Sequence, residues 1–210
     1  MYLPHQFQET RNAALHELIV HHPFATLVTQ GAEALDADHL PFVLDADSGE
    51  HGRLRGHVAR ANPLWKTVED NANVLVVFQG PQAYITPSWY PAKREHGRVV
   101  PTWNYGVVHA YGRIRFIQDA DWLCRLVGDL TNIHEAEREA PWHVQDAPAD
   151  YIAKMLRAIV GVEIEITRLV GKWKASQHKP DDERLEIEQG LHEESGLSCR
   201  DSGYLAGRDS

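Results

Sequence analysis

The sequence predicts a mainly β fold with peripheral helices, in the form of a small antiparallel barrel. About six apolar or alternating segments follow one another at short intervals, a pattern that favours antiparallel neighbours over a βαβ array. The segments with helical periodicity lie before or after these strands, so we expect them at the periphery. The 210 residues, of which 43% are hydrophobic, are enough for one domain with its own core.

The first part of the chain predicts one helix and three strands. Apolar residues at helical spacing predict a helix over 9–21, which His21, His22 and Pro23 would end. Alternating, β-branched residues predict strands over 24–30, 39–44 and 52–58. Pro41 cannot donate a ladder hydrogen bond, so we expect the second strand at a sheet edge or at a bulge.

The middle of the chain predicts a short helix and two strands around a long loop. Asn62 as N-cap and Pro63 as first residue predict a helix over 63–71. Strands are expected over 73–78 and 102–117, and the segment 80–105 contains four prolines and two tryptophans. Because prolines fix backbone angles, we expect a shaped loop, and loops of this length are usually functional. In the alternative interpretation, its tryptophans only close the end of a barrel.

The last part predicts helices over 119–134 and 147–158, a strand over 159–167 and a helix over 181–192. Residues 181–210 contain nine acidic and three basic side chains, and 195–210 has the composition of a weakly ordered segment. We therefore expect a split between one domain over 1–192 and an acidic, polar tail over 193–210.

Composition argues against several classes of function. The formal net charge of −9 disfavours a broad phosphate-binding surface for nucleic acid. No apolar stretch is long enough to span a membrane and the N-terminus lacks signal-peptide features, so we expect a cytoplasmic protein with no membrane contact. Cys124 and Cys199 lie far apart, and the thirteen histidines lack zinc-ligand spacing. Neither a disulfide framework nor a metal site is expected.

Three polar segments place cations or amides next to aromatic residues. The first, 56–63, runs from a strand into a helix start, where free amides beside Arg60 could hold a phosphate. The second is the central loop with Ser88, Lys93 and Trp103, and the third contains Lys172, Trp173 and Gln177. A phosphate ester joined to a flat ring suits this combination, and FMN has both parts. Taken singly, each segment could instead be a capped helix, a solvated basic loop or a barrel-end tryptophan.

Other nucleotide and catalytic signatures are missing from the sequence. It contains no GxGxxG after a strand, no GxxxxGK[ST] and no GxSxG elbow. No side chain is predicted as a catalytic acid, base or nucleophile. If the protein is an enzyme, the chemistry would belong to a bound cofactor.

Long strings of the sequence resemble the PaiB family, described as FMN-binding negative transcriptional regulators. The strings include PFATLVT at 23–29, GHVARANPLW at 56–65, FQGPQAYITPSWY at 78–90, VPTWNY at 100–105 and GKWKASQ at 171–177. The resemblance implies a split β-barrel similar to pyridoxamine-phosphate oxidases, and a homodimer with flavin at the subunit interface. One departure is His178, where the family more often has Asn.

The resemblance also implies roles for individual residues. The phosphate and ribityl candidates are His57, Ala59, Arg60 and Asn62. Lys93, Trp103, Trp173 and Gln177 would come from the loop and the C-terminal segment, of the same or the partner subunit.

We therefore expect an FMN-binding protein of the PaiB type, linked to negative transcriptional regulation by an indirect or flavin-dependent route. One alternative is a flavin-dependent oxidoreductase with a small-molecule substrate that the sequence does not identify. Another is a repressor that binds DNA directly, which the acidic composition and the lack of a helix-turn-helix spacing disfavour. A third is a barrel whose cofactor site has become an interaction surface.

Overall fold

The computed structural model describes residues 1–210 except 32–33, 198–200, 202–203, 206 and 208–210. The chain divides into two compact units, and each is built from separate stretches of sequence. Unit 1 comprises 1–18, 79–108 and 170–210, and unit 2 comprises 19–78 and 109–169. The boundary expected between residues 192 and 193 stays a prediction.

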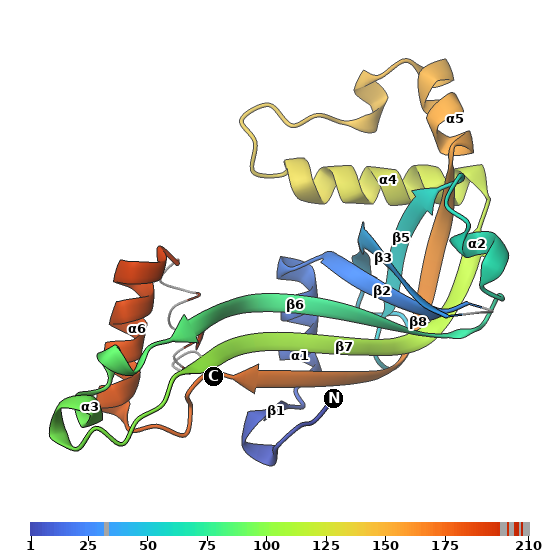
Figure 1. Cartoon of the computed structure of the whole chain (residues 1–210). Coiled ribbons are helices and arrows are strands. Elements are labelled where there is room, and N and C mark those ends of the chain that lie inside the picture. Colours follow the sequence, from blue (N-terminus) through green and yellow to red (C-terminus); the bar gives the residue numbers. More distant parts are fainter. Residues whose placement is uncertain (32–33, 198–200, 202–203, 206, 208–210) are drawn as a thin grey trace. The chain divides into compact units, whose positions relative to one another are not determined.

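The described strands form one antiparallel sheet in the order β3-β2-β6-β7-β8-β5-β4, with β1 paired to β8. This order confirms the mainly β fold with peripheral helices, and the sheet of the described strands is not closed. The long strands β6, β7 and β8 contribute residues to both units (Figure 1). The strands are β1 (Gln8–Glu9), β2 (Phe24–Gln30), β3 (Leu35–Pro41), β4 (Val43–Asp45), β5 (Arg53–Ala59), β6 (Asn73–Ile85), β7 (Thr102–Ile117) and β8 (Ile159–Lys174).

Helices occupy the periphery of the sheet. The α-helices are α1 (Asn12–His21), α2 (Leu64–Thr67), α3 (Pro91–Glu95), α4 (Ala120–Glu135), α5 (Ala149–Arg157) and α6 (Asp181–Ser195). The 3-10 turns are η1 (His5–Phe7), η2 (Pro87–Trp89) and η3 (Val144–Asp146). Within unit 2, α4 begins after Asp119, whose carboxylate accepts a hydrogen bond from the backbone N–H of Trp122 at 2.8 Å.

In unit 2, alternation along the strands separates a buried face from a second face that carries charges. Leu54, Gly56 and Val58 of β5 are buried, while the intervening residues are half-buried. Helix α4 packs onto β4, where Leu126 and Leu130 contact Val43. Apolar alternation therefore defines β5, as the sequence predicts.

Two segments of unit 2 differ from the expectation. The strand expected over 39–44 is divided at Phe42 into β3 and β4, and β3 lies at the end of the described strand order. The edge position expected for Pro41 is thus confirmed. The helix expected over 63–71 is a single turn, Leu64–Thr67, which ends where Val68 takes an extended conformation. The carboxamide of Asn62 accepts a hydrogen bond from the N–H of Leu64 at the start of this turn, as expected of an N-cap.

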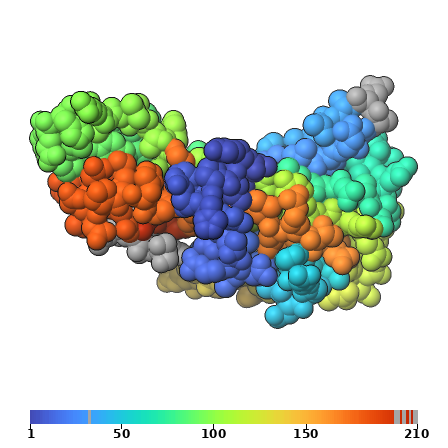
Figure 2. All heavy atoms as spheres, turned by 90° about the horizontal axis from the view of Figure 1, so that it is seen from below, coloured from blue at the N-terminus to red at the C-terminus, as the bar shows by residue number. Residues whose placement is uncertain are grey.

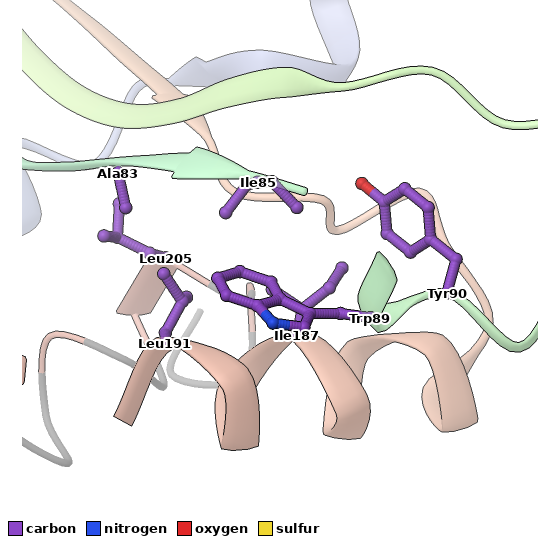
Figure 3. Packing of buried hydrophobic residues seen from close by; sticks show 7 residues of the cluster. All are labelled: Ala83, Ile85, Trp89, Tyr90, Ile187, Leu191 and Leu205. Atoms are coloured by element: carbon purple, nitrogen blue, oxygen red, sulfur yellow. The ribbon is translucent and has the colours of Figure 1, made fainter. Parts of the chain in front are cut away.

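The core of unit 1 forms around the tryptophan of the central loop. Trp89 packs with Ile187 and Leu191 of α6, and Figure 3 shows them with Ile85. Its indole N–H donates to a carboxylate oxygen of Glu194 at 2.9 Å. Trp89 is therefore a core residue that joins the loop to the C-terminal helix.

Residues near the C-terminus also belong to this core. Leu205 is fully buried, and the ring of Tyr204 lies where a Cβ at residue 106 would be, so this position requires glycine. The weakly ordered segment expected over 195–210 is wrong for these two residues. The rest of that expectation, including Cys199, falls partly outside the described residues.

Strands β6 and β8 both continue beyond their expected ends. The central loop was expected to begin at Gly80, but β6 runs to Ile85, and β8 runs to Lys174. The register pairs β2 with β6 only over Leu75–Val77, so Pro81 lies where β6 needs no partner on that side. Close packing favours glycine at position 80, because an added Cβ would lie 2.9 Å from Cδ1 of Leu18.

The N-terminal residues of unit 1 pair with the end of β8. Gln8 and Glu9 lie opposite Lys172 and Gly171 in antiparallel register. The space-filling view shows the blue N-terminal residues next to the orange-red C-terminal residues of the same unit (Figure 2). The last residues of β8, which include the candidates Lys172 and Trp173, are therefore paired with a segment that is distant in sequence.

Candidate functional site

The ten candidate residues fall into both units. His57, Ala59, Arg60 and Asn62 lie in unit 2, and Ser88, Lys93, Trp103, Lys172, Trp173 and Gln177 lie in unit 1. The convergence of the two sets into one site stays a prediction.

In unit 2, Arg60 follows β5 and its guanidinium is held by three neutral acceptors. Nε donates to the carbonyl of Arg157 at 2.6 Å, and Nη2 donates to the carbonyl of Ile159 at 3.0 Å. Nη1 donates to Oε1 of Gln118 at 2.8 Å. The guanidinium carbon also lies 5.7 Å from the ring centroid of Trp65. Arg60 is thus fixed in place while its charge is not neutralised by these partners.

His57 and Asn62 differ in what they leave free. Burial lowers the pKa of His57, so its neutral form is favoured, and its Nδ1 has no hydrogen-bond partner among the described residues. Asn62 donates to Oδ1 of Asp38 at 2.6 Å and accepts from the N–H of Leu64 at 2.8 Å. Ala59 ends β5 opposite Ile159. His57 therefore retains an unused ring nitrogen, whereas Asn62 mainly shapes the turn.

In unit 1, Lys172 is a buried cation placed among aromatic rings. Lys172 is only 8% exposed. Its Nζ lies 5.3 Å from the ring centroid of Tyr105 and 5.8 Å from that of Tyr2. Nζ donates to the carbonyl of Tyr2 at 3.3 Å. In the described part of the chain, no carboxylate forms an ion pair with Lys172. A buried charge without a counterion is costly, so this position favours an anion.

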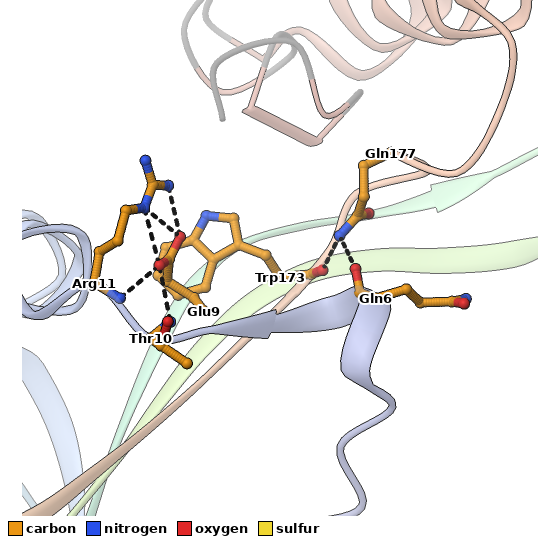
Figure 4. A network of polar contacts seen from close by, with 6 residues as sticks. All are labelled: Gln6, Glu9, Thr10, Arg11, Trp173 and Gln177. Carbon is orange, nitrogen blue, oxygen red and sulfur yellow. Dashed lines mark hydrogen bonds and ion pairs between the residues drawn. The ribbon is translucent and has the colours of Figure 1, made fainter.

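The side-chain amide of Gln177 forms its hydrogen bonds with backbone groups of the protein, which indicates a structural role. Its Nε2 donates to the carbonyl oxygens of Gln6 at 3.0 Å and Trp173 at 2.6 Å (Figure 4). Its Oε1 accepts from the N–H of Ala175 at 2.9 Å. The indole of Trp173 lies 5.4 Å from the ring of Tyr204, measured between centroids. Gln177 therefore ties the N-terminal segment to the end of β8.

The loop candidates lie closer to solvent. Nζ of Lys93 donates to Oγ of Ser88 at 3.0 Å, so these two form one polar pair. Trp103 is 54% exposed and its ring meets that of Tyr84 edge-on at 6.0 Å. An exposed indole beside a second ring offers a surface on which a flat ligand can stack.

A cavity of about 380 Å³ lies within unit 1, and none of the ten candidates lines it. Its walls include the cationic side chains of Arg98, Lys174 and Lys179. Sequence reasoning noted Lys174 in its segment but did not select it. The useful signal was alternation, because residues 172 and 174 share one face of a strand once β8 is known to extend that far.

The family comparison agrees with the chemistry of these residues. Residues 1–168 match the family model described as "Putative FMN-binding domain". The chain belongs to this family. A Bacillus subtilis relative, "Protease synthase and sporulation protein PAI 2", is 31% identical over 205 residues, with 98% of this chain and 96% of the relative covered. The resemblance to the PaiB family and the expectation of FMN as cofactor are both confirmed.

Other relatives extend the family to fungi and to solved folds. An uncharacterized protein of Emericella nidulans is 35% identical over 226 residues, covering 91% of this chain and 90% of the relative. The structure of the FAD and heme binding protein from Mycobacterium smegmatis has a TM-score of 0.59 at 17% identity, covering 87% of this chain and 80% of that chain. The flavocytochrome Anf3 from Azotobacter vinelandii has a TM-score of 0.57 at 14% identity, with 80% and 70% covered. These likenesses support the fold.

The residues of both units fit FMN by their chemistry. The phosphate requires cations that are not already neutralised, and Arg60 and Lys172 meet that requirement. The unpartnered Nδ1 of His57 suits a hydroxyl of the ribityl chain. Trp103 supplies an exposed aromatic face.

No helix in the described part of the chain has the length and apolar character needed to cross a membrane.

Proposed function

We propose that this PaiB-type protein acts through its bound FMN, and that its link to negative transcriptional regulation is indirect. The observation that carries the proposal is the position of Lys172, a buried amine between the rings of Tyr2 and Tyr105 whose hydrogen-bond acceptor is a neutral carbonyl. An anionic group attached to an aromatic system is the ligand that such a position favours.

In this proposal the two sets of candidates hold different parts of the cofactor. In unit 2, Arg60 holds the phosphate and His57 holds the ribityl chain with the backbone near Ala59, and in unit 1, Lys172 is an alternative cation for the phosphate. Trp103 and Trp173 contact the ring, while Asn62 and Gln177 keep the binding segments in place. When bound, FMN supplies one- and two-electron redox chemistry.

The test is an FMN titration of the purified protein followed by absorbance and by quenching of flavin fluorescence. We expect saturable binding that the Lys172→Met variant weakens by about tenfold or more. The matched control is Lys154→Met, which removes one charge from the exposed face of α5. Equal weakening in both variants would mean that only net charge matters.

The indirect route is supported by charge. The chain carries a formal net charge of −9, and α6 opens with Asp181, Asp182 and Glu183, so this helix would repel phosphate. The test is retardation of promoter DNA by FMN-loaded protein at low salt. We expect no retardation, and a salt-sensitive shifted band would instead favour direct repression.

A flavin-dependent oxidoreductase is the second candidate, favoured by the cavity of unit 1, which a small molecule could occupy. Its test is the rate at which photoreduced, FMN-loaded protein is reoxidised by small electron acceptors. A rate no faster than that of free FMN would remove this candidate.

A homodimer and a cytoplasmic location are also part of the proposal. A sizing column coupled to light scattering, run with and without FMN, tests the dimer. A monomer in both conditions would mean that one chain supplies every FMN contact.

A further inference from the structure

The cavity of unit 1 combines cations with an apolar wall. Arg98 and Lys174 line it together with Phe7, Val99 and Val100. No Asp or Glu is among the lining residues that the structure describes. In a chain with a net charge of −9, a cavity with this lining is unusual and favours an anion.

Lys174 is half-buried, whereas Arg98 is exposed. Nζ donates to the carbonyl of Trp103 at 2.7 Å and to Oγ1 of Thr102, which leaves one N–H for a ligand. Burial lowers the pKa of Lys174; the neighbouring Lys172 acts in the same direction, and Tyr105 opposes both. A bound anion would favour the charged amine by Coulombic attraction and so offset the cost of burial and the repulsion from Lys172.

Two polar residues, Ser176 and Asn104, also line the cavity. Ser176 has a φ of 59°, which is strained for a residue with a side chain, and it is 1% exposed. Its Oγ accepts from Nδ2 of Asn104 at 2.7 Å, and the same Nδ2 donates to the carbonyl of Leu205 at 2.8 Å. The strained residue is thus fully buried and hydrogen-bonded to Asn104, and strained backbone of this kind is common at functional sites.

The third cation, Lys179, differs from the other two. Its Nζ forms an ion pair with Glu183 at 2.6 Å and lies 3.9 Å from the ring centroid of Tyr90. Its charge is therefore already neutralised by Glu183, so we do not expect it to bind the ligand. The remaining unneutralised cations are Lys174 and the exposed Arg98, whose planar fork suits a carboxylate or a phosphate.

We propose that this cavity binds a small organic acid, with a carboxylate or phosphate head on Arg98 and Lys174 and a compact apolar body against Phe7 and Val99. The site is separate from the proposed FMN contacts, because none of the ten FMN candidates lines the cavity. A volume of about 380 Å³ suits a ligand of the size of one aromatic ring with its acid group and bound water. The proposal goes beyond the proposed function and does not require that FMN react with the acid.

The test is calorimetric titration of FMN-saturated protein with benzoate, phenyl phosphate and the neutral analogue benzamide. We expect at least one acid to bind about tenfold or more tightly than benzamide, and the preferred acid identifies the head group. Arg98→Gln should reduce acid affinity by about tenfold, while Arg94→Gln, in the nearby helix α3 and outside the cavity, should leave it unchanged. Flavin absorbance recorded during each titration reports FMN release.

Three outcomes would overturn the proposal: benzamide binding as tightly as both acids, equal affinities in Arg98→Gln and the unmodified chain, or FMN release in proportion to acid bound. The last result would mean that the cavity is part of the FMN site. Failure of FMN to bind at all contradicts the proposed function instead, and the acid titration is then run on the FMN-free protein with the same expected ratios.

Discussion

The amine of Lys172 lies 5.3 Å from the ring centroid of Tyr105, in a position that is almost fully buried. Its hydrogen-bond acceptor is the neutral carbonyl of Tyr2. This relationship places an unneutralised cation beside an aromatic face, and the proposed FMN contact depends on it.

For Lys172, the conservative variant separates charge from packing. Lys172→Met should lower FMN affinity by about tenfold or more, because a charge-assisted contact is lost. Lys172→Arg keeps the charge and should recover most of the affinity. FMN affinities of Met and Arg variants that agree with each other would contradict a role for the charge.

Arg60 should contribute to both binding and folding. Arg60→Ala removes the donors to the carbonyls of Arg157 and Ile159, so we expect a loss of about 1–3 kcal/mol in the free energy of unfolding. We also expect FMN affinity to fall by about tenfold or more. Urea denaturation measures the first effect and FMN titration of the folded variant the second. Lower stability with unchanged affinity would assign Arg60 to structure alone.

Two helix glycines provide a matched test of the core of unit 1. A Cβ at Gly190 of α6 would collide with the indole of Trp89, while a Cβ at Gly128 of α4 meets nothing within 4 Å. Gly190→Ala should destabilise the protein by about 1–3 kcal/mol. Gly128→Ala should be neutral or stabilise it by up to about 1 kcal/mol, because alanine favours the helix. Thermal unfolding of both variants checks the difference in sign.

Tyr204 should make the protein sensitive to high pH. Burial raises the pKa of Tyr204, and its hydroxyl has no hydrogen-bond partner among the described residues. Above the ordinary tyrosine pKa of about 10, the unfolded chain loses this proton while the folded chain retains it, so stability falls as pH rises. Tyr204→Phe should reduce that fall. The measurement is the urea midpoint between about pH 9 and pH 11, and parallel curves for both proteins would assign the loss to other groups.

Sequence patterns predicted the elements whose burial alternates regularly. The observed bounds of β2 and β7 equal the expected ones; burial alternates throughout β2 and along most of β7, apart from three consecutive buried residues at 106–108. The limits of β6 and β8 could not be predicted in this way. Gly80 and Pro81 are typical of a turn, yet β6 continues through both residues. Gly80 is in close contact with Leu18, and Pro81 lies beyond the residues of β6 that pair with β2, so its missing N–H breaks no bond to that strand.

The sequence indicates residue types that suit the candidate site, but it does not show which contacts each side chain makes. The sequence identified Lys172 as a cation near aromatic residues, but no local pattern shows that Gln177 spends its amide on the carbonyls of Gln6 and Trp173. Arg98 was not selected because its proposed role arises from a cavity formed by segments that are far apart in sequence. Such long-range contacts have no signature in a single sequence.

The most direct test of the account is the absorbance spectrum of the purified protein, recorded before and after addition of FMN and removal of the unbound flavin. The account predicts a retained flavin band at about 450 nm that saturates at one FMN per chain. At the same subsaturating FMN concentration, it predicts a weaker band for Lys172→Met. A folded protein that retains no flavin, or a Lys172→Met variant that retains as much as the unmodified chain, would contradict it.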